Sequence, residues 1–272
     1  VFRTVDLRYD IVDENTRNVI YTVEEDKRLN VSLLFGYGSY ELLRGGIELE
    51  QQNVLGRAHH QRLRAIQSFK ATSFDYLYTM PEFFGERVDI FASAFYLRRD
   101  EVSFTREEFG GGAGARTYLD AIRSDFSARY DYQILSANRI NAIEGPPEAA
   151  VSAIVLDLQH DRRDSPLYPR RGYRTFGSLE LASEYLGGEV NYIRVDTQGS
   201  YHQPLDPGRW LHFGFSHGVT FTLGTSREDL PFNKRFFPGG DSSVRGFQYG
   251  EAAPRNSAGQ IVGAETYTLG NL

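Results

Sequence analysis

The amino-acid sequence predicts an all-β fold, an antiparallel β-barrel that spans a membrane, and three observations lead to this prediction. Apolar and polar residues alternate over unusually long segments, and charged residues gather between these segments. No apolar run approaches the ~18 residues that indicate a transmembrane helix. Because a barrel strand carries its apolar residues in alternation, its hydropathy is weak even where it crosses a membrane. The pattern therefore favours strands as the spanning elements.

The alternation is clearest in the segment 211–223. Soluble β-sandwich strands also alternate, but they usually run ~5–6 residues, whereas a tilted membrane strand needs ~9–11. The segment 126–134 shows a similar split. The odd-numbered face of 211–223 is apolar apart from one histidine and carries Leu211, Phe213, Phe215, His217, Val219, Phe221 and Leu223. The even-numbered face has no large apolar residue and carries His212, Gly214, Ser216, Gly218, Thr220 and Thr222.

Composition agrees with one large all-β domain or two ordinary ones. The 272 residues are 40% hydrophobic and 24% charged, so the chain is neither disordered nor built of apolar helices. The 17 Tyr, 19 Phe and 27 Gly favour a barrel, and the absence of Cys suits an oxidising compartment, although many cytosolic proteins also lack it. The net charge of −6 argues against a nucleic-acid partner.

The first 28 residues differ from the rest of the chain. Alternating residues at 5–11 and 19–23 flank a turn at 13–16, which is typical of a hairpin, and a charge run at 24–28 follows. We expect residues 1–28 to be the end of a small soluble domain and 29–272 to be the barrel. No signal peptide precedes Val1, so an exported protein would be present here as a mature fragment.

About twelve barrel strands are expected, spaced ~20 residues apart, with bounds that are uncertain by a few residues. They are predicted at 31–38, 44–54, 60–71, 73–80, 87–98, 105–118, 124–136, 150–160, 172–185, 190–203, 209–224 and 264–272. The glycines at 110–114 lack the Lys-Ser/Thr of a phosphate loop and indicate a flexible loop or a kinked strand.

The connection at 225–263 is rich in aromatic residues and glycines between 230 and 247. Its rings need burial, and its glycines permit tight turns, so we expect it inside the barrel lumen and call it the lumenal loop. An arginine buried there, Arg245, would need a carboxylate partner because an unpaired buried guanidinium is very costly. The sequence does not identify that acid.

This loop resembles the lumenal loop of the BamA/TamA superfamily of outer-membrane assembly and translocation barrels, which reads Phe-x-x-Gly-Gly-x-x-x-Val-Arg-Gly-Phe/Tyr. The resemblance implies that Arg245 anchors the loop in the lumen, that the glycines serve loop geometry, and that Phe236, Phe237 and Phe247 pack against the lumen wall. The matching residues are Phe236, Gly239, Gly240, Val244, Arg245, Gly246 and Phe247.

A second stretch, 156–173, resembles the superfamily's Asp-x-Arg-Asp-x-Pro-x-x-Pro-x-x-Gly strand turn. Its two prolines and one glycine would end one strand and begin the next, and its charges could form local ion pairs. Residues 45–57 are similar to an early strand end of the family, and the hairpin at 1–28 resembles the end of a periplasmic POTRA domain. The turn residues are Asp161, Arg163, Asp164, Pro166, Pro169 and Gly172.

The resemblance implies an assembly factor in the bacterial outer membrane, with its N-terminal part in the periplasm. Its partners would be outer-membrane lipid, unfolded outer-membrane protein substrates, and periplasmic or lipoprotein assembly subunits, and no cofactor is implied. Family barrels have sixteen strands, so a chain with twelve would be C-terminally incomplete. Substrates would enter at a lateral seam between the first and last strands, here formed by Val31, Leu33, Phe35, Gly36 and Gly38.

Three other functions remain open. The chain could belong to a two-partner secretion pore that exports a polypeptide, or to the membrane anchor of a fused lipase. A passive porin fits less well because the lumenal loop would plug it. A metal site is not expected, since His59 and His60 are adjacent and His212 and His217 face opposite sides of one strand. No nucleophile elbow is present, so the chain itself is not expected to be an enzyme.

Overall fold

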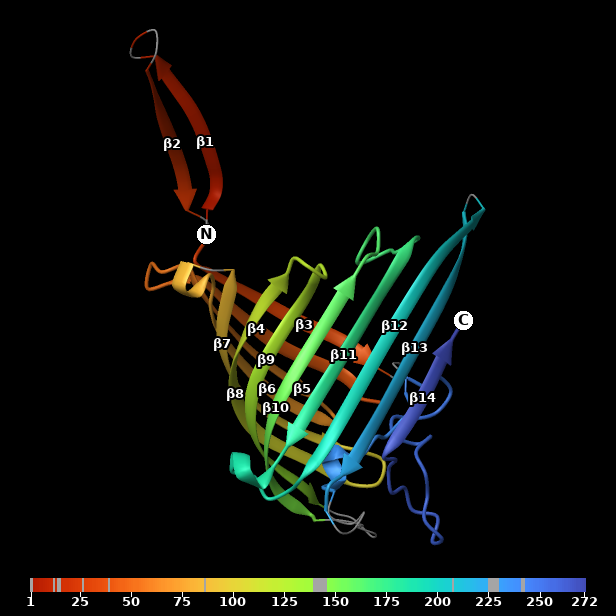
Figure 1. The fold of residues 1–272 in the computed structure, drawn as a ribbon. Coiled ribbons are helices and arrows are strands. Elements are labelled where there is room, and N and C mark those ends of the chain that lie inside the picture. The colour runs from red at the N-terminus through yellow and green to blue at the C-terminus, as the bar shows by residue number, and fades with distance from the viewer. Residues whose placement is uncertain are drawn as a thin grey trace.

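The computed structural model describes residues 2–11, 13, 16–25, 27–38, 40–85, 87–138, 146–206, 208–224, 230–240 and 243–272. Across these ranges the fold is all-β, as predicted. It contains a two-stranded sheet and a twelve-stranded antiparallel sheet (Figure 1). The helices described are short 3-10 turns: η1 (Phe83–Gly85), η2 (Glu184–Leu186) and η4 (Phe232–Lys234). Within the same ranges, no helix has the length and apolar character needed to span a membrane.

The larger sheet is a sequential meander in which each strand pairs antiparallel with its neighbours along the chain. The prediction of about twelve strands is confirmed. Their bounds differ from the predicted ones by a few residues, because several predicted strands ran into turns. The strands are β3 (Leu29–Gly38), β4 (Leu42–Val54), β5 (His59–Ser68), β6 (Ala71–Met80), β7 (Val88–Asp100), β8 (Thr105–Leu119), β9 (Ser124–Asn138), β10 (Glu148–Asp161), β11 (Gly172–Ala182), β12 (Tyr192–Asp206), β13 (Arg209–Thr222) and β14 (Thr266–Asn271).

The sheet curves strongly, so it has a convex outer face and a concave inner face (Figure 1). Consecutive antiparallel strands place their connections alternately at two ends. One end, here the hairpin end, receives the chain entering β3 and holds the β4–β5, β6–β7, β8–β9, β10–β11 and β12–β13 connections. The other end, here the loop end, holds the remaining connections, including the one from β13 to β14 that forms the lumenal loop.

The two faces of β13 show which side of the sheet meets lipid. Phe213 and Phe221 on the predicted apolar face are 48% and 55% exposed, whereas Gly214, Gly218 and Thr220 on the other face are buried. Soluble proteins bury their apolar face, so this arrangement is inverted. It is the one expected for a barrel strand in a bilayer, with its apolar residues outward.

The inner face holds charges that are paired across neighbouring strands. Arg129 on β9 forms an ion pair with Asp131 at 2.8 Å and a second one with Asp157 on β10. The hydroxyl of Ser178 on β11 donates to Asp157 at 2.6 Å. These contacts compensate the cost of removing the charges from water.

The glycine-rich stretch at 110–114 lies within β8, so the alternative of a flexible loop was wrong. A Cβ added at Gly112 would lie 2.6 Å from the Tyr130 carbonyl oxygen and would also collide with the Asp131 carboxylate. Glycine therefore leaves the space that the charged side chains of β9 occupy.

The N-terminal hairpin forms a separate sheet of β1 (Phe2–Ile11) and β2 (Arg17–Glu25), which confirms the two predicted strands. Residues 14 and 15 of the predicted turn lie outside the described residues. Apolar side chains such as Ile11 and Tyr21 are 76% and 66% exposed. A two-stranded hairpin is marginally stable alone, so this one is expected to need a further partner surface. Its assignment to a POTRA domain stays a prediction.

Candidate functional site

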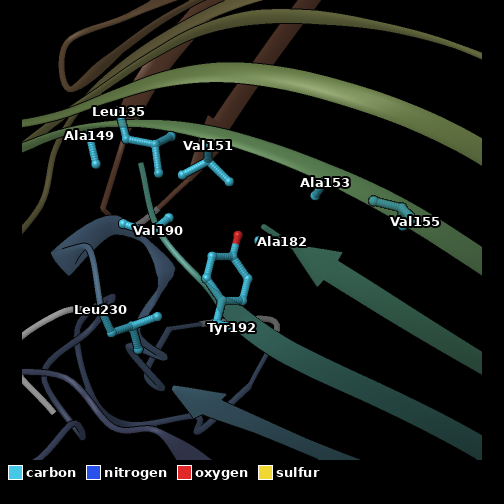
Figure 2. Close-up of a cluster of buried hydrophobic side chains, with 9 residues drawn as sticks. All are labelled: Leu135, Ala149, Val151, Ala153, Val155, Ala182, Val190, Tyr192 and Leu230. Carbon is cyan, nitrogen blue, oxygen red and sulfur yellow. The ribbon is translucent and has the colours of Figure 1, made fainter. Parts of the chain in front are cut away.

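The lumenal loop begins with a segment packed against the inner face, residues 230–238, which we call the anchored segment. Leu230 is fully buried and joins a cluster of apolar side chains from the sheet, shown in Figure 2 beside Tyr192. Residues 225–229, before it, lie outside the described residues. The rest of the cluster consists of Leu135, Ala149, Val151, Ala153, Val155, Ala182, Val190 and Tyr192.

An aromatic cluster follows directly. Phe232 is fully buried, and its ring meets Phe104, from the β7–β8 connection, edge-on with centroids 4.7 Å apart. The ring of Phe237 lies 5.2 Å from both of them. Such offset aromatic pairs add to the free energy gained from burial alone. The predicted packing of Phe237 against the lumen wall agrees with this geometry.

Lys234 makes a largely buried ion pair with the sheet. Its Nζ lies 2.8 Å from Glu180 Oε1 on β11, and both side chains are at most 15% exposed. The Tyr192 hydroxyl donates to the same carboxylate oxygen at 2.5 Å, and Lys234 Nζ also donates to Gln133 at 3.2 Å. Three strands of the wall thus hold one loop cation.

The neighbours of Lys234 strengthen this attachment. Asn233 donates to the Ser136 carbonyl of β9 at 3.1 Å. Arg194 on β12 donates to the Lys234 carbonyl at 3.1 Å, and its guanidinium lies over the Phe236 ring at 4.2 Å. Arg194 is itself paired with Asp196 at 2.7 Å. Backbone and side chains of the anchored segment are therefore both fixed to the wall.

The buried arginine of the loop is Arg235, which is only 2% exposed. Its Nη1 donates to the Val262 carbonyl at 3.1 Å, and its guanidinium lies over the Phe232 ring at 5.6 Å. Sequence reasoning missed Asn233, Lys234 and Arg235 as site residues. The available indication was three consecutive polar residues set between phenylalanines in a segment already expected to be buried.

Arg245, which was expected to be buried, lies near the surface of the described residues. Its side chain is exposed, and the described residues include no ion pair to it. Phe247 is 51% exposed, so its packing against the wall stays a prediction. Both residues lie in residues 243–248, which we call the tip, and residues 241 and 242 of the motif fall outside the described residues. A role of Arg245 as an anchor stays a prediction.

Two motif glycines, Gly239 and Gly240, join the anchored segment to the tip, and the third, Gly246, lies within the tip. Gly239, Gly240 and Gly246 have φ values of +136°, +90° and +93°, a region that L side chains rarely adopt. A Cβ at Gly239 would collide with the Gln248 carbonyl oxygen. Gly240 donates its N–H to the Phe247 carbonyl at 3.0 Å. Val244 is half-buried between these contacts.

The predicted strand turn lies between β10 and β11 at the hairpin end. Asp161 and Arg163 form an ion pair at 2.6 Å, and Arg163 also reaches the Pro166 carbonyl at 3.5 Å. Asp164 accepts hydrogen bonds from the backbone N–H groups of Arg170 and Arg171, at 2.9 and 3.2 Å, and these lower the pKa of its carboxyl. Pro169 and Gly172 follow, and Gly172 has a φ of +104°.

The predicted seam lies on β3, which pairs with β4 and forms one edge of the sheet, while β14 forms the other. Val31, Leu33 and Phe35 are 57%, 67% and 82% exposed. Gly36 and Gly38 are opposite Arg44 and Leu42 of β4 in the antiparallel register. The structure therefore brings the five seam residues together on one strand.

His202 and His212 are opposite each other on β12 and β13, with Nδ1 atoms 3.2 Å apart. Within the described ranges, no group of three or more His, Asp or Glu side chains is placed to hold a metal ion.

An apolar outer face, paired charges on the inner face and a loop folded into the lumen define a transmembrane β-barrel with an occupied lumen. The chain belongs to the Omp85 superfamily, whose domain matches residues 53–272.

Its relatives include proteins of animals and of bacteria. The chain is 24% identical over its whole length to the mouse sorting and assembly machinery component 50 homolog, covering 59% of that protein. It is 25% identical, over 98% of its length, to the outer membrane protein assembly factor BamA of Nitratidesulfovibrio vulgaris, covering 33% of it. The chain therefore spans about three fifths or less of these relatives.

Solved structures share the fold. BamA from Haemophilus ducreyi lacking POTRA domains 1–3 matches 99% of this chain with a TM-score of 0.85 and 18% identity, covering 57% of that structure. CdiB from Acinetobacter baumannii matches 92% of the chain with a TM-score of 0.53 and 14% identity, covering 49%. At these identities the likeness concerns the fold alone.

Proposed function

We propose that this chain is part of an outer-membrane assembly factor that guides β-barrel or autotransporter substrates into the membrane. The Omp85 superfamily match and the relatives named as assembly components support this proposal. The chain spans only part of those relatives, so substrates and partner subunits belong to the proposal.

The observation that carries the proposal is the position of β3 at an edge of the sheet. Within the described residues β3 pairs on one side only, so the backbone groups on its other side can pair with an incoming strand. Gly36 and Gly38 have no side chain to pack, which weakens pairing and favours opening. Substrate strands would add to this edge and transfer their apolar faces directly to lipid.

The proposed orientation follows from the hairpin. If β1 and β2 end a POTRA domain, the hairpin end of the sheet faces the periplasm and the loop end faces outward. The exposed apolar residues of β1 and β2 support a missing partner surface in that domain. The fold likeness to BamA extends over 99% of the chain and so reaches into this hairpin.

Deletion of residues 31–38 in the full-length protein tests the proposal directly. We expect substrate insertion into membranes to be lost, since the receiving edge is removed. A less drastic form uses cysteines, which this chain lacks. Leu33→Cys on β3 should cross-link to a substrate strand, whereas Leu211→Cys, on β13 within the sheet, should not. Normal insertion after the deletion would overturn the seam.

A further inference from the structure

A contact cluster joins the lumenal loop to the first hairpin of the large sheet. Tyr249, just beyond the tip, stacks on Tyr40, with ring centroids 5.8 Å apart and planes inclined by 27°. Tyr40 lies in the connection between β3 and β4. The loop leaves β13, next to the β14 edge, so this contact reaches across the inner face to the opposite edge of the sheet.

Arg99, near the end of β7, also contacts the stacked pair of Tyr249 and Tyr40, so a third element of the sheet takes part in the cluster. Its guanidinium lies over the Tyr249 ring at 5.2 Å, and its Nη1 is 3.3 Å from the Tyr249 hydroxyl. Its Nη2 forms an ion pair with Glu41 at 3.1 Å. One arginine thus holds both the loop tyrosine and the residue after Tyr40. Cation–π contacts of this kind gain strength where they are partly desolvated.

Tyr40 is itself held in place. Its hydroxyl donates to the Asp100 carbonyl, and Lys70 Nζ lies over its ring at 5.9 Å. Burial, together with the charges of Glu101 and Asp100, raises the pKa of Tyr40 to about 12. The hydroxyl therefore remains protonated and can donate across the physiological pH range.

The position of Tyr249 depends on how the loop folds around its glycines. The Ala252 N–H donates to the Pro238 carbonyl at 3.0 Å, which folds the chain after the tip back onto the anchored segment. A Cβ at Gly240 would lie only 3.4 Å from the Tyr249 ring. Lys234, four residues before Pro238, fixes the anchored segment to β11. The position of Tyr249 therefore depends on contacts on the far side of the lumen.

The loop also contacts β14 through Phe236. Phe236 forms an antiparallel bridge with Ala264, and its ring lies 4.7 Å from Tyr267 on β14. We propose that Tyr249 is a positioning residue that latches the lumenal loop to the β3–β4 hairpin, so that one loop contacts both β14 and the first hairpin of the sheet. The consequence for substrate entry rests on the proposed function, whereas the latch itself does not.

Hydrogen exchange of the full-length protein in lipid nanodiscs tests the latch. Tyr249→Ala should accelerate exchange of the amides in residues 29–54 at least tenfold, because the hairpin loses its attachment to the loop. Tyr40→Ala should do the same, and the double variant should add little, since both changes remove one contact. Tyr249→Phe keeps the ring and should restore most of the protection. Tyr185→Ala, at a fully exposed tyrosine of the same end, is the matched control.

Unchanged exchange in folded Tyr249→Ala protein would overturn the latch, as would a Tyr249→Phe variant that behaves like the alanine variant. If Tyr249→Ala does not fold, Tyr249→Leu carries the same test, since it keeps apolar volume without a stacking ring. Substrate insertion measured in parallel separates the two proposals. Accelerated exchange with normal insertion supports the latch and contradicts its role in the proposed function.

Discussion

The two parts of the lumenal loop differ sharply although they are only a few residues apart. In the anchored segment, Phe232 and Arg235 are 0% and 2% exposed, whereas in the tip Phe247 is 51% exposed and Arg245 is exposed as well. The family-like Val-Arg-Gly-Phe residues lie in the tip. The contacts that hold the loop come mainly from the anchored segment, so the motif identifies the loop while burial identifies its attachment.

The largest effect is expected from breaking the buried ion pair. Lys234→Met leaves Glu180 buried without its cation, which typically costs about 3–5 kcal/mol. Urea unfolding of the refolded barrel in detergent measures the free energy of unfolding. Arg57→Met, in the exposed β4–β5 turn, should change it by less than about 0.5 kcal/mol. If both variants lowered the free energy of unfolding equally, the buried ion pair would contribute no more than an exposed surface residue.

Substitution of a glycine before the tip, Gly239, should cost more stability than substitution of a glycine within it, Gly246. Gly239→Ala combines a strained φ with a collision against backbone, so we expect a loss of about 2 kcal/mol or more. Gly246→Ala has a positive φ but meets no atom within 4 Å, so about 1 kcal/mol is expected. Thermal unfolding midpoints compare them. A larger loss at Gly246 would contradict the assignment of the tip as the less constrained part.

Arg245→Ala should have a small effect on the conductance of the full-length protein in planar bilayers. The anchored segment keeps its own contacts to β9, β11 and β12 when the tip is changed. We therefore expect low conductance with and without the substitution. A large rise in conductance would mean that Arg245 holds the plug, and it would favour the two-partner secretion pore over the assembly factor.

The smallest effect is expected in the β10–β11 turn, a reference outside the lumen. Backbone N–H groups lower the pKa of Asp164 in the fold, so its contribution to stability is present above the unfolded pKa and is lost as pH falls through the lowered value. Asp164→Asn should lower the urea midpoint slightly at pH 7 and much less at pH 3. If Asp164→Asn lowered the urea midpoint by the same amount at pH 7 and pH 3, the charge of Asp164 would not be the source of its contribution to stability.

The sequence was sufficient for the architecture because each strand repeats one local pattern. The alternation at 211–223 predicted both the strand and its apolar face, which the exposure of Phe213 and Phe221 confirms. The number of strands followed from the same pattern. The bounds of the strands could not be predicted in this way. A bulge or turn residue such as Asn53, with a φ of +55°, does not interrupt the alternation of apolar and polar residues.

The contacts that hold the loop to the sheet could not be predicted from one sequence. The partner of Lys234 lies 54 residues earlier, and the pairing depends on the register of β9, β11 and β12. Arg245 sits in a recognisable motif, whereas Arg235, just before that motif, is the arginine that is buried. Tyr249 carried no motif at all, and its contact with Arg99 joins residues 150 positions apart.

The passage from β2 to β3 has a mechanical consequence. Only residues 26–28 separate the two strands, a length that spans about 10 Å when fully extended. The carbonyl of Arg28 accepts a hydrogen bond from the Gln52 N–H of β4 at 2.8 Å, so the end of this short linker is already fixed to the sheet. A force on the N-terminal hairpin is therefore delivered to the edge strand rather than absorbed by the linker. A force applied to the N-terminal hairpin would therefore act first on β3.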